Sequence, residues 1–592
     1  MLPRRLACSR IALAGLAAAL ALGLYWPVLR IGFFQDDAVQ IAMVDGDFTV
    51  QRSPLDLFRF ADTERDGREP LDAGVLPWWS SDDLRIAMFR PLPSALIAFD
   101  RRVFGLDPRA AHLHSLVWLA GCGAAFSLAL AELLPAPVAA LSVIAFVVNE
   151  AHATPVAWLA NRSYLIAGTF GWLAIWAHAR ARRRPGWASA LLEATCFGFA
   201  LASGEYALMF LGYLFALELV AGTGNLRAQT RALLPALAPA LAFLGLRVAL
   251  GFGARGSGFY IDPIAAPRAF ASAAFERLPS LAAGLVFGEQ LNPTHPGPLA
   301  RIALAVVAGG VLIAAAWAAA RRWTPPAPSN LLALAVGALA SLVPAAGALP
   351  DNRLVGVAAG GVAAVFAAVV VAATSSCLRG LRKRRLARAI ASLALGLLVV
   401  WVHGFGAASA SRLRLALFAE LVDAEWRWAQ DAEIPDDPQA RVLFLSGADF
   451  TTNANLVWIR RLAGHPLPLS IWRLSPYRLA HQITRVADNQ LEVLVHEGFT
   501  APVSGSLYRA ASQPLVPGTE IQLAGMRVEV LEASGGEPAR MRFVFERSLD
   551  DPAYVFLNAT PTGLKRITIP AVGGRLRLAP AAVPPLRVAS PP

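Results

Sequence analysis

Long apolar runs recur along this chain from near its start to about residue 408. A helix needs about 20 apolar residues to cross a bilayer core of about 30 Å. The runs therefore predict about eleven membrane-spanning helices, at residues 11–31, 111–133, 135–149, 163–179, 187–203, 206–222, 232–250, 298–320, 330–349, 354–375 and 388–408. A composition that is 56% apolar and 16% charged, with a mean hydropathy of +0.50, excludes an ordinary soluble globular protein. The predicted class is an all-α polytopic membrane protein embedded in a lipid bilayer.

The placement of positive charge predicts the orientation of these helices. The net charge of +12 does not indicate a nucleic-acid partner, because the arginines gather in short segments between the apolar runs. If the N-terminus is cytoplasmic, every cluster falls on the cytoplasmic side, as the positive-inside bias requires; the clusters lie at residues 4–5, 180–184, 227–231, 321–322 and 379–388. Only two of the 53 basic residues are lysines, which is typical of a GC-rich bacterial genome. We therefore expect a bacterial inner-membrane protein with its C-terminal region in the periplasm.

The sequence pattern changes after the last apolar run. Residues 409–437 have the spacing of an amphipathic helix, and from residue 438 short runs alternate apolar and polar side chains between Gly, Pro and Asp. Such alternation predicts half-buried strands. The expected division is therefore a membrane domain over 1–408, a helical connector over 409–437 and a β-rich periplasmic domain over 438–592, with a helix near 452–463 and a hairpin turning at Ala524–Gly525.

Two long polar segments interrupt the membrane domain. Residues 32–90 and 251–297 are expected to form external loops, and Trp78 and Trp79 in the first of them suit the interface between lipid and water.

Two adjacent carboxylates, Asp36 and Asp37, follow the first apolar run in the sequence IGFFQDD. Charge placed where lipid meets water is costly, and ionisable residues at membrane depth are functional candidates by default. The alternative is ordinary solvated loop charge after a span. We take the pair as the candidate catalytic group.

Further polar side chains are expected on the same outer face as the aspartate pair. Carboxylates and imidazoles there could hold a divalent cation, Mg²⁺ or Mn²⁺, whereas arginines could bind the phosphate of a lipid-linked substrate. Headgroup contacts of the arginines and helix capping by the acidic and imidazole groups are the alternatives. The candidates are Arg90, Arg162 and Arg353 for phosphate, and His114, Glu150, His152 and Glu205 for metal or substrate.

An ordered series of motifs resembles a known family. The series is FFQDDAVQIAMVDGDF, FRPLPSALIAFDRRVFGLDPRAAHLHSLV, EAHATPVAWLANRSYLIAG, SGEYALMF and DNRLVGVAAGG. It resembles the membrane half of the tetratricopeptide-repeat transmembrane O-mannosyltransferases and their bacterial relatives, which are GT-C glycosyltransferases. The matching motifs are closely spaced over residues 30–215 and sparse from residue 215 to residue 375. It implies a GT-C-like catalytic membrane domain that uses a polyprenyl-phosphate sugar donor with inversion, outside the cytoplasm.

The resemblance also implies roles for single residues. Asp36 or Asp37 would be the catalytic base, while the other orients it or binds metal. Arg90 matches the arginine of the family's RPL element, Arg162 that of its GR element, and Arg353 the arginine that heads the late span. Glu205 matches the glutamate of the SKE element, and His114 falls near a family histidine.

The chain departs from the family in three places. The family's H-P-x-H-x-E pattern appears here as residues 149–154, where His152 remains, the first His and the final Glu are missing, and an acidic group has appeared at Glu150. The lysine before Glu205 is Gly204. The tetratricopeptide repeats are absent, so the acceptor, whether glycan, lipid or protein, stays open. The predicted function is a hexosyltransferase; a membrane-anchored scaffold or binding protein and a transporter of lipid-linked substrates are the alternatives.

Overall fold

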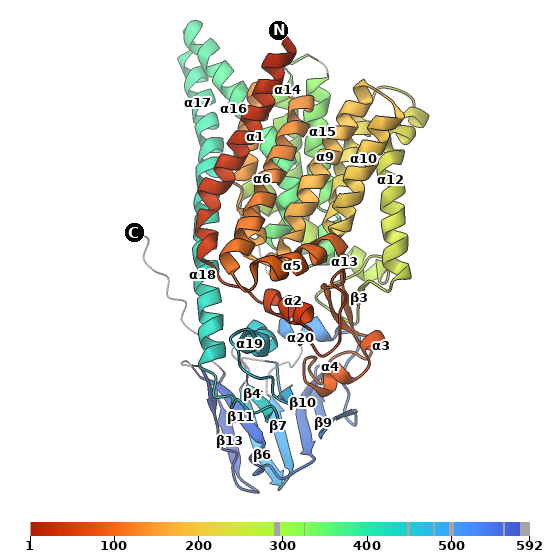
Figure 1. Ribbon diagram of the computed structural model, residues 1–592. Helices are drawn as coiled ribbons and strands as arrows, with labels where there is room; N and C mark the ends of the chain where they lie inside the picture. Colours follow the sequence, from red (N-terminus) through yellow and green to blue (C-terminus); the bar gives the residue numbers. More distant parts are fainter. Residues whose placement is uncertain are drawn as a thin grey trace. The chain divides into compact units, whose positions relative to one another are not determined.

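The structure is a computed structural model (Figure 1), and it describes residues 2–288, 297–321, 323–324, 326–446, 450–476, 480–495, 503–560 and 563–580. Contacts divide the chain into two compact units. Unit 1 comprises residues 1–31, 89–251 and 266–419, and unit 2 comprises residues 32–88, 252–265 and 420–592. Both predicted external loops therefore contribute to unit 2, together with the C-terminal region. The consecutive division at residues 408 and 437 stays a prediction, because the contacts group segments that are distant in sequence.

Unit 1 is built from apolar helices. Every one of the predicted apolar runs coincides with a helix: α1 (Leu2–Tyr25), α6 (Pro108–Leu133), α7 (Ala136–Val147), α9 (Ser163–Arg183), α10 (Trp187–Ala202), α11 (Met209–Ala221), α12 (Leu226–Ala249), α14 (Pro298–Ala320), α15 (Ala327–Ser341), α16 (Gly356–Arg382) and α17 (Leu386–Val400). Among the described residues, seven helical segments are long and apolar enough to cross a membrane, or eight if α7 and the segment Glu150–Ala157, bent by 48°, form one span. The number is lower than predicted because α10 and α11 have 16 and 13 residues and α9 ends in arginines.

The remaining helices of unit 1 are α5 (Pro91–Phe104), the short α8 (Ala153–Ala157), α13 and the first part of α18 (Ala407–Gln430). Helix α13 (Pro267–Phe287) corrects the expectation of a loop over 251–297. Pro267 starts this helix at its first turn, where proline is favoured, and the Arg277 guanidinium is accommodated by donating to the Ala346 carbonyl at 3.0 Å. The sequence did not predict this helix because Glu276, Arg277 and Pro279 interrupt its apolar pattern.

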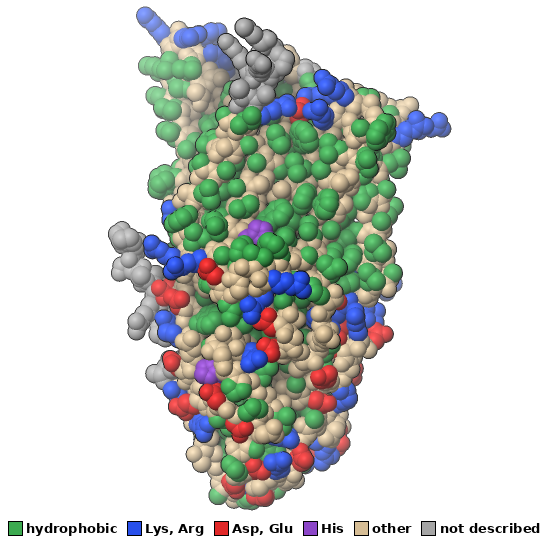
Figure 2. Space-filling view, in the orientation of Figure 1, with side chains coloured by type: hydrophobic (Ala, Val, Ile, Leu, Met, Phe, Trp, Pro, Cys, Tyr) green, Lys and Arg blue, Asp and Glu red, His purple; other side chains and the backbone are tan. Residues whose placement is uncertain are grey.

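Small residues let the helices of unit 1 approach closely, as is usual in membrane proteins. A side chain at Gly171 of α9 would lie 2.3 Å from the Phe210 ring of α11, and one at Gly360 of α16 would lie 2.3 Å from the Trp172 ring. Hydrophobic side chains dominate the face of the helical region drawn in Figure 2. Exposed large apolar side chains of the unit include Leu234, Leu241, Val306, Val307, Leu393 and Leu397. The chain is a membrane protein by these features.

Unit 2 is rich in β-structure, as predicted for its C-terminal part. Strands β6 (His481–Ala487), β7 (Gln490–Val495), β8 (Glu520–Leu523), β9 (Met526–Ser534), β10 (Glu537–Phe545) and β13 (Arg575–Leu578) form a six-stranded antiparallel sheet in the order β13-β6-β7-β10-β9-β8. Pairing of Leu523 with Met526 confirms the hairpin at Ala524–Gly525.

The second large sheet of unit 2 has the order β12-β11-β4-β5. Strands β4 (Arg441–Ser446), β5 (Ser470–Arg473) and β11 (Tyr554–Thr560) are parallel, and β12 (Gly563–Arg566) pairs antiparallel to β11. The predicted helix near 452–463 is α19 (Phe450–Leu462), which connects β4 to β5. A third sheet joins the two loops, through β1 (Arg59–Asp62), β2 (Arg85–Ala87) and β3 (Gly253–Arg255).

The tryptophans of the first loop lie in the core of unit 2, not at a lipid interface as expected. Trp78 and Trp79 are each 2% exposed and pack with side chains of the β-rich region. The Trp78 ring meets the Phe543 ring edge to face at 5.9 Å, and its indole N–H donates to the Leu474 carbonyl at 3.3 Å. Burying two large aromatic side chains joins the loop firmly to the β-rich region.

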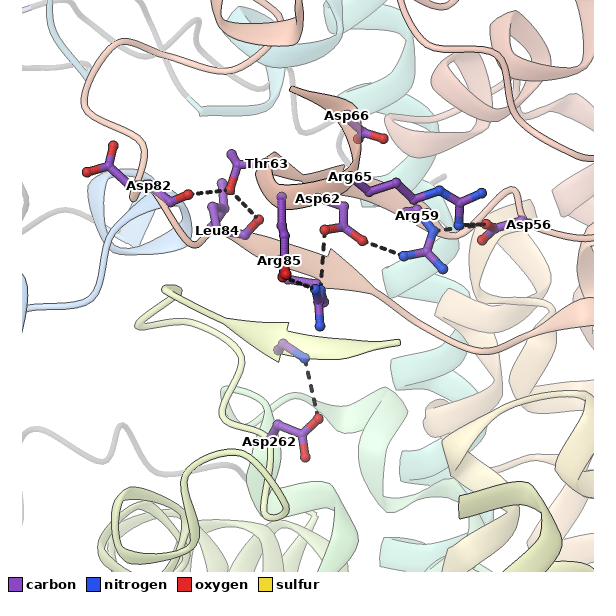
Figure 3. Close-up of polar contacts among 12 residues, drawn as sticks. Asp56, Arg59, Asp62, Thr63, Arg65, Asp66, Asp82, Leu84, Arg85 and Asp262 are labelled. Atoms are coloured by element: carbon purple, nitrogen blue, oxygen red, sulfur yellow. Dashed lines mark hydrogen bonds and ion pairs between the residues drawn. The ribbon is translucent and has the colours of Figure 1, made fainter. Parts of the chain in front are cut away.

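A buried charge network stabilises the first loop (Figure 3). The Arg59 guanidinium, 1% exposed, donates to Asp56 at 2.9 Å and to Asp62 at 2.5 Å. Its Cζ also lies 4.2 Å from the centre of the Phe252 ring, which belongs to the second loop. Arg85 completes the network with an ion pair to Asp62 at 3.3 Å.

Removing Arg59 will leave two carboxylates buried without their main counter-charge. We expect Arg59→Ala to lower the free energy of unfolding by about 3–5 kcal/mol, measured by thermal unfolding of the detergent-solubilised protein. Arg65→Ala is the matched control, because Arg65 is 61% exposed and only 3.8 Å from Asp56; it should change stability by less than about 1 kcal/mol. Equal effects of the two substitutions would contradict the role of the network.

Candidate active site

Polar residues gather in unit 1 where short 3₁₀ segments interrupt the helices. These segments are η2 (Glu150–His152), η3 (Leu159–Asn161), η4 (Glu205–Leu208) and η6 (Asn352–Val355). We call the residues that they and their neighbours contribute the polar layer: Arg90, Glu150, Trp158, Asn161, Glu205, Tyr206, Arg247, Asn352, Arg353 and Arg414. Irregular backbone within a membrane protein is tolerated where it is buried in protein or lines a polar space, so these breaks mark the polar part of the unit.

Glu205 holds two arginines in the polar layer. Its carboxylate lies 3.3 Å from the Arg90 Nε and 3.6 Å from the Arg247 Nε, and it also accepts the Phe89 backbone N–H at 3.3 Å. Arg90 and Arg247 have side chains that are 14% and 10% exposed, so the charges are largely shielded from water. The group consists of two cations and one anion, and it therefore carries a net charge of +1.

Local structure places Arg90 against Glu205. Arg90 precedes Pro91, which starts α5, and the residue before a proline is kept out of the helical conformation; Arg90 has a φ of −131° and a ψ of 63°. Gly204 adopts a φ of 122°, and a side chain there would lie 2.7 Å from Arg90 Cγ. Gly204 thus leaves room for the Arg90 side chain, whose Cζ lies 5.2 Å from the centre of the Tyr206 ring.

The rest of the polar layer forms two further links. The Tyr206 hydroxyl donates to Asn161 Oδ1 at 3.2 Å, which joins η4 to η3. The Asn352 amide donates to Glu150 Oε1 at 2.6 Å, which joins η6 to η2, and the Arg414 guanidinium lies 4.0 Å from Glu150 Oε2.

Arg353 belongs to the same layer. Its Cζ lies 4.9 Å from the centre of the Trp158 ring, and its Nε lies 3.8 Å from Asp351 Oδ1. The Arg353 side chain is 17% exposed, which makes its guanidinium partly accessible.

Arg162 lies in a separate, enclosed network. It is 1% exposed and donates to the Asp100 carboxylate, to Ser115 Oγ at 2.9 Å and to the Ala111 carbonyl at 2.8 Å. Asp100, on α5, also accepts from His114 Nδ1 at 2.7 Å. These contacts tie α5 to α6 and α9, and they favour a positioning role over direct binding of a phosphate.

The two predicted histidines have both ring nitrogens engaged. His114 Nε2 accepts from the Trp118 indole N–H at 3.0 Å while Nδ1 faces Asp100. His152, 0% exposed, donates from Nε2 to the Phe146 carbonyl at 2.9 Å, and its Nδ1 faces the Tyr164 hydroxyl at 3.4 Å. A metal ligand needs a nitrogen lone pair that points at the ion, so neither ring is arranged for that role.

The predicted divalent cation finds no ligand set in the described part of the chain. No group of three or more His, Cys, Asp or Glu side chains is arranged there to hold a metal ion. Mg²⁺ and Mn²⁺ require several converging oxygen ligands, and the carboxylate of Glu205 is instead paired with arginines. The cation stays a prediction, and no chemical step is assigned to it.

The aspartate pair lies in unit 2, at the start of α2 (Asp36–Asp45). Asp37 is 1% exposed, and its carboxylate accepts the Phe34 backbone N–H at 3.0 Å. Asp36 is partly exposed. Gln35 precedes the pair with a φ of 46° and a ψ of −112°, a backbone conformation that is strained for a residue with a side chain. Asp37 is therefore held by a hydrogen bond to the backbone just before the helix, whereas Asp36 presents the more accessible carboxylate.

The structure brings some predicted site residues together within unit 1 and separates others. Arg90, Glu150, Glu205 and Arg353 belong to the polar layer, whereas Arg162 and His114 share the enclosed network and His152 packs on Tyr164. Sequence reasoning missed Arg247 and Arg414. An arginine inside an apolar run was the available signal for Arg247.

The sequence matches no family model and no curated protein. Solved structures that resemble the chain include ArnT from Cupriavidus metallidurans bound to undecaprenyl phosphate, with 13% identity and a TM-score of 0.41 over 78% of this chain and 89% of that chain. Another is the archaeal oligosaccharyltransferase AglB from Archaeoglobus fulgidus in complex with an inhibitory peptide and a dolichol-phosphate, with 14% identity and a TM-score of 0.47. That match covers 78% of this chain but only 64% of AglB. These structures are GT-C membrane glycosyltransferases; likenesses this distant establish no activity, substrate or residue role for this chain.

The enclosed network predicts a stability effect at Arg162. We expect Arg162→Gln to lower the free energy of unfolding by about 3–5 kcal/mol, because Asp100 would remain buried without its counter-charge. Thermal unfolding in detergent measures this, with the exposed Arg102→Gln on α5 as control. A stable Arg162→Gln protein that has lost only substrate binding would instead favour the phosphate-binding role.

Proposed function

We propose that the protein is an integral membrane glycosyltransferase of the GT-C type that transfers a hexose from a polyprenyl-phosphate donor to an acceptor on the periplasmic face of a bacterial inner membrane. The observation that carries this proposal is the group formed by Arg90, Glu205 and Arg247. The ordered motif series in the sequence supports the same reaction class.

The charge of this group suits a phosphodiester. Two guanidinium groups lie beside one carboxylate in this group, and a polyprenyl-phosphate sugar carries one negative charge at its phosphodiester. Arginine matches phosphate oxygens through its planar array of N–H donors, and charge-assisted hydrogen bonds are strengthened where water is excluded. Arg353, partly exposed in the same layer, is a further candidate contact for the phosphate.

The reaction needs only a proton acceptor and a stabilised leaving group. The acceptor hydroxyl oxygen forms a bond to the anomeric carbon, and the bond from that carbon to the phosphate oxygen breaks. The electron pair leaves with the phosphate, whose added negative charge the arginines stabilise. The hydroxyl proton passes to a carboxylate acting as general base, and attack from the face opposite the phosphate inverts the anomeric centre. Asp36 or Asp37 is the predicted base.

Two alternatives have less support. A transporter of lipid-linked substrates is expected to place charge along a path through the membrane between paired broken helices, whereas a binding protein or scaffold needs no paired arginines held by a shared carboxylate. Neither alternative accounts for the group around Glu205.

Loss of either arginine should impair use of the lipid-linked donor. We expect Arg90→Gln and Arg247→Gln each to lower kcat/KM for polyprenyl-phosphate hexose by about tenfold to hundredfold, because a hydrogen bond to a charged group contributes roughly 1.5–3 kcal/mol. Transfer of labelled sugar by purified protein in detergent measures this, and the exposed Arg109→Gln is the control.

A parallel assay with EDTA tests the predicted cation. Lack of transfer by the folded wild-type protein with several hexose donors would refute the proposed function.

Substitutions of the two aspartates should have different effects: we expect Asp36 to be needed for turnover and Asp37 for stability. Asp36→Asn should reduce kcat by about 100-fold or more while leaving thermal stability unchanged, because a general base contributes typically 10²–10⁴-fold. Asp37→Asn should mainly reduce stability, by about 1 kcal/mol, since it weakens the buried hydrogen bond that the carboxylate accepts from the Phe34 backbone N–H. The reverse pattern, with full turnover in Asp36→Asn, would assign the base to Asp37 or exclude this pair.

A further inference from the structure

Asn161, the last residue of η3, has a side-chain amide that is only partly satisfied by the protein. The residue is 3% exposed, and its Oδ1 accepts the Tyr206 hydroxyl at 3.2 Å. Its amide nitrogen is buried and has no hydrogen-bond partner among the described residues. Native proteins pair nearly all of their buried polar groups. The amide of Asn161 therefore marks a place in the polar layer where a further acceptor is needed.

Two pairs of arginine and aromatic side chains are connected to Asn161. The Tyr206 ring, whose hydroxyl binds the amide, lies 5.2 Å from Arg90 Cζ. The backbone N–H of Asn161 donates to the Trp158 carbonyl at 3.0 Å, and the Trp158 ring lies 4.9 Å from Arg353 Cζ. Asn161 thus lies in the same part of unit 1 as the two arginines, which are both proposed phosphate contacts.

Arg90 also contacts the segment that carries Asn161 directly. Its Nη1 donates to Ser163 Oγ at 3.4 Å, and Ser163 begins α9 two residues after Asn161. Ser163 is 0% exposed, so this contact is enclosed by protein. The Arg90 guanidinium and the Asn161 amide therefore belong to one small region, joined through Tyr206 on one element and through Ser163 on the other.

The neighbouring carboxylates of the polar layer have other partners. Glu205 faces two arginines, and Glu150 accepts from the Asn352 amide at 2.6 Å. Neither carboxylate accepts from the Asn161 amide. The missing acceptor is therefore one that a bound ligand can supply, and arginines close by favour an anionic ligand.

We infer that the Asn161 amide donates a hydrogen bond to a phosphate oxygen of the lipid-linked donor, beside the guanidinium groups of Arg90 and Arg353. Asparagine side chains are among the groups that bind phosphate oxygens in proteins. A charged oxygen is also a stronger acceptor than a sugar hydroxyl. The inference rests on the proposed transferase function, and it adds an uncharged, directional contact to the charged ones.

Binding of polyprenyl phosphate, which carries no sugar, tests this contact without turnover. Affinity is measured at equilibrium with labelled lipid and the full-length protein in detergent. We expect Asn161→Ala to weaken binding by about tenfold or more, the effect of losing one hydrogen bond to a charged group. Asn161→Asp keeps an acceptor for the Tyr206 hydroxyl but places a carboxylate where the donor was, so it should weaken binding at least as much. Binding of polyprenol, which lacks the phosphate, should not change.

Two further variants separate the contact from a structural role of Asn161. Tyr206→Phe breaks the link between η3 and η4 but keeps both the amide and the ring near Arg90, so it should weaken binding less than Asn161→Ala does. Asn225→Asp is the matched control, because Asn225 is exposed and caps α12 through its side-chain oxygen, which aspartate retains. Thermal unfolding in detergent shows that each variant is folded.

Three results would overturn the inference. They are unchanged binding of polyprenyl phosphate in both folded Asn161 variants, an equal loss in Tyr206→Phe and Asn161→Ala, and a loss confined to polyprenyl-phosphate hexose, which would assign the amide to the sugar. Any of these with normal transfer by the wild type leaves the transferase function intact. Weakened binding in the Asn161 variants without any transfer by the wild type would support the phosphate contact and refute the transferase function.

Discussion

Pairing of arginine with carboxylate inside low-dielectric surroundings is the interaction on which both units depend. Isolated charges are expensive to bury, and removal of one partner from a buried pair costs more than the pair itself contributes. In unit 1, Arg162 is enclosed with Asp100 and fastens α5 to the apolar helices. In unit 2, Arg59 is enclosed with Asp56 and Asp62 and organises the first loop. These pairs restrict the position of the backbone segments that carry them, because each buried guanidinium needs several hydrogen-bond acceptors at the same time.

One group of charges differs from these closed networks. Arg90 and Arg247 both lie beside the carboxylate of Glu205, so two guanidinium groups meet at one carboxylate there. The Arg162 side chain is 2% exposed, whereas the side chains of Arg90 and Arg247 are 14% and 10% exposed. This difference in exposure is a reason to propose phosphate binding for Arg90 and Arg247 and a positioning role for Arg162.

The apolar runs predicted most of the helical architecture, because each run coincides with a helix, although α10 and α11 are shorter than a bilayer crossing requires. The same reasoning failed at α13, where Glu276, Arg277 and Pro279 broke the apolar pattern although the Ala346 carbonyl accommodates the arginine. It also placed Trp78 and Trp79 at a lipid interface, when aromatic partners about 460 residues later bury them in a protein core. Both errors arise from contacts between residues that are distant in the chain.

The sequence by itself determined that the chain is a helical membrane protein with a β-rich C-terminal region, because hydrophobic length and strand alternation are local properties. It also singled out the candidate residues by their type and position. Only the tertiary structure decided how the candidates are paired: Glu205 lies between Arg90 and an arginine of α12, and Arg162 and His114 are enclosed. It also decided that Phe33 and Gln35, just before Asp36, contact Trp426 and Glu425. Those relations depend on distances between segments far apart in sequence, and no local pattern encodes such distances.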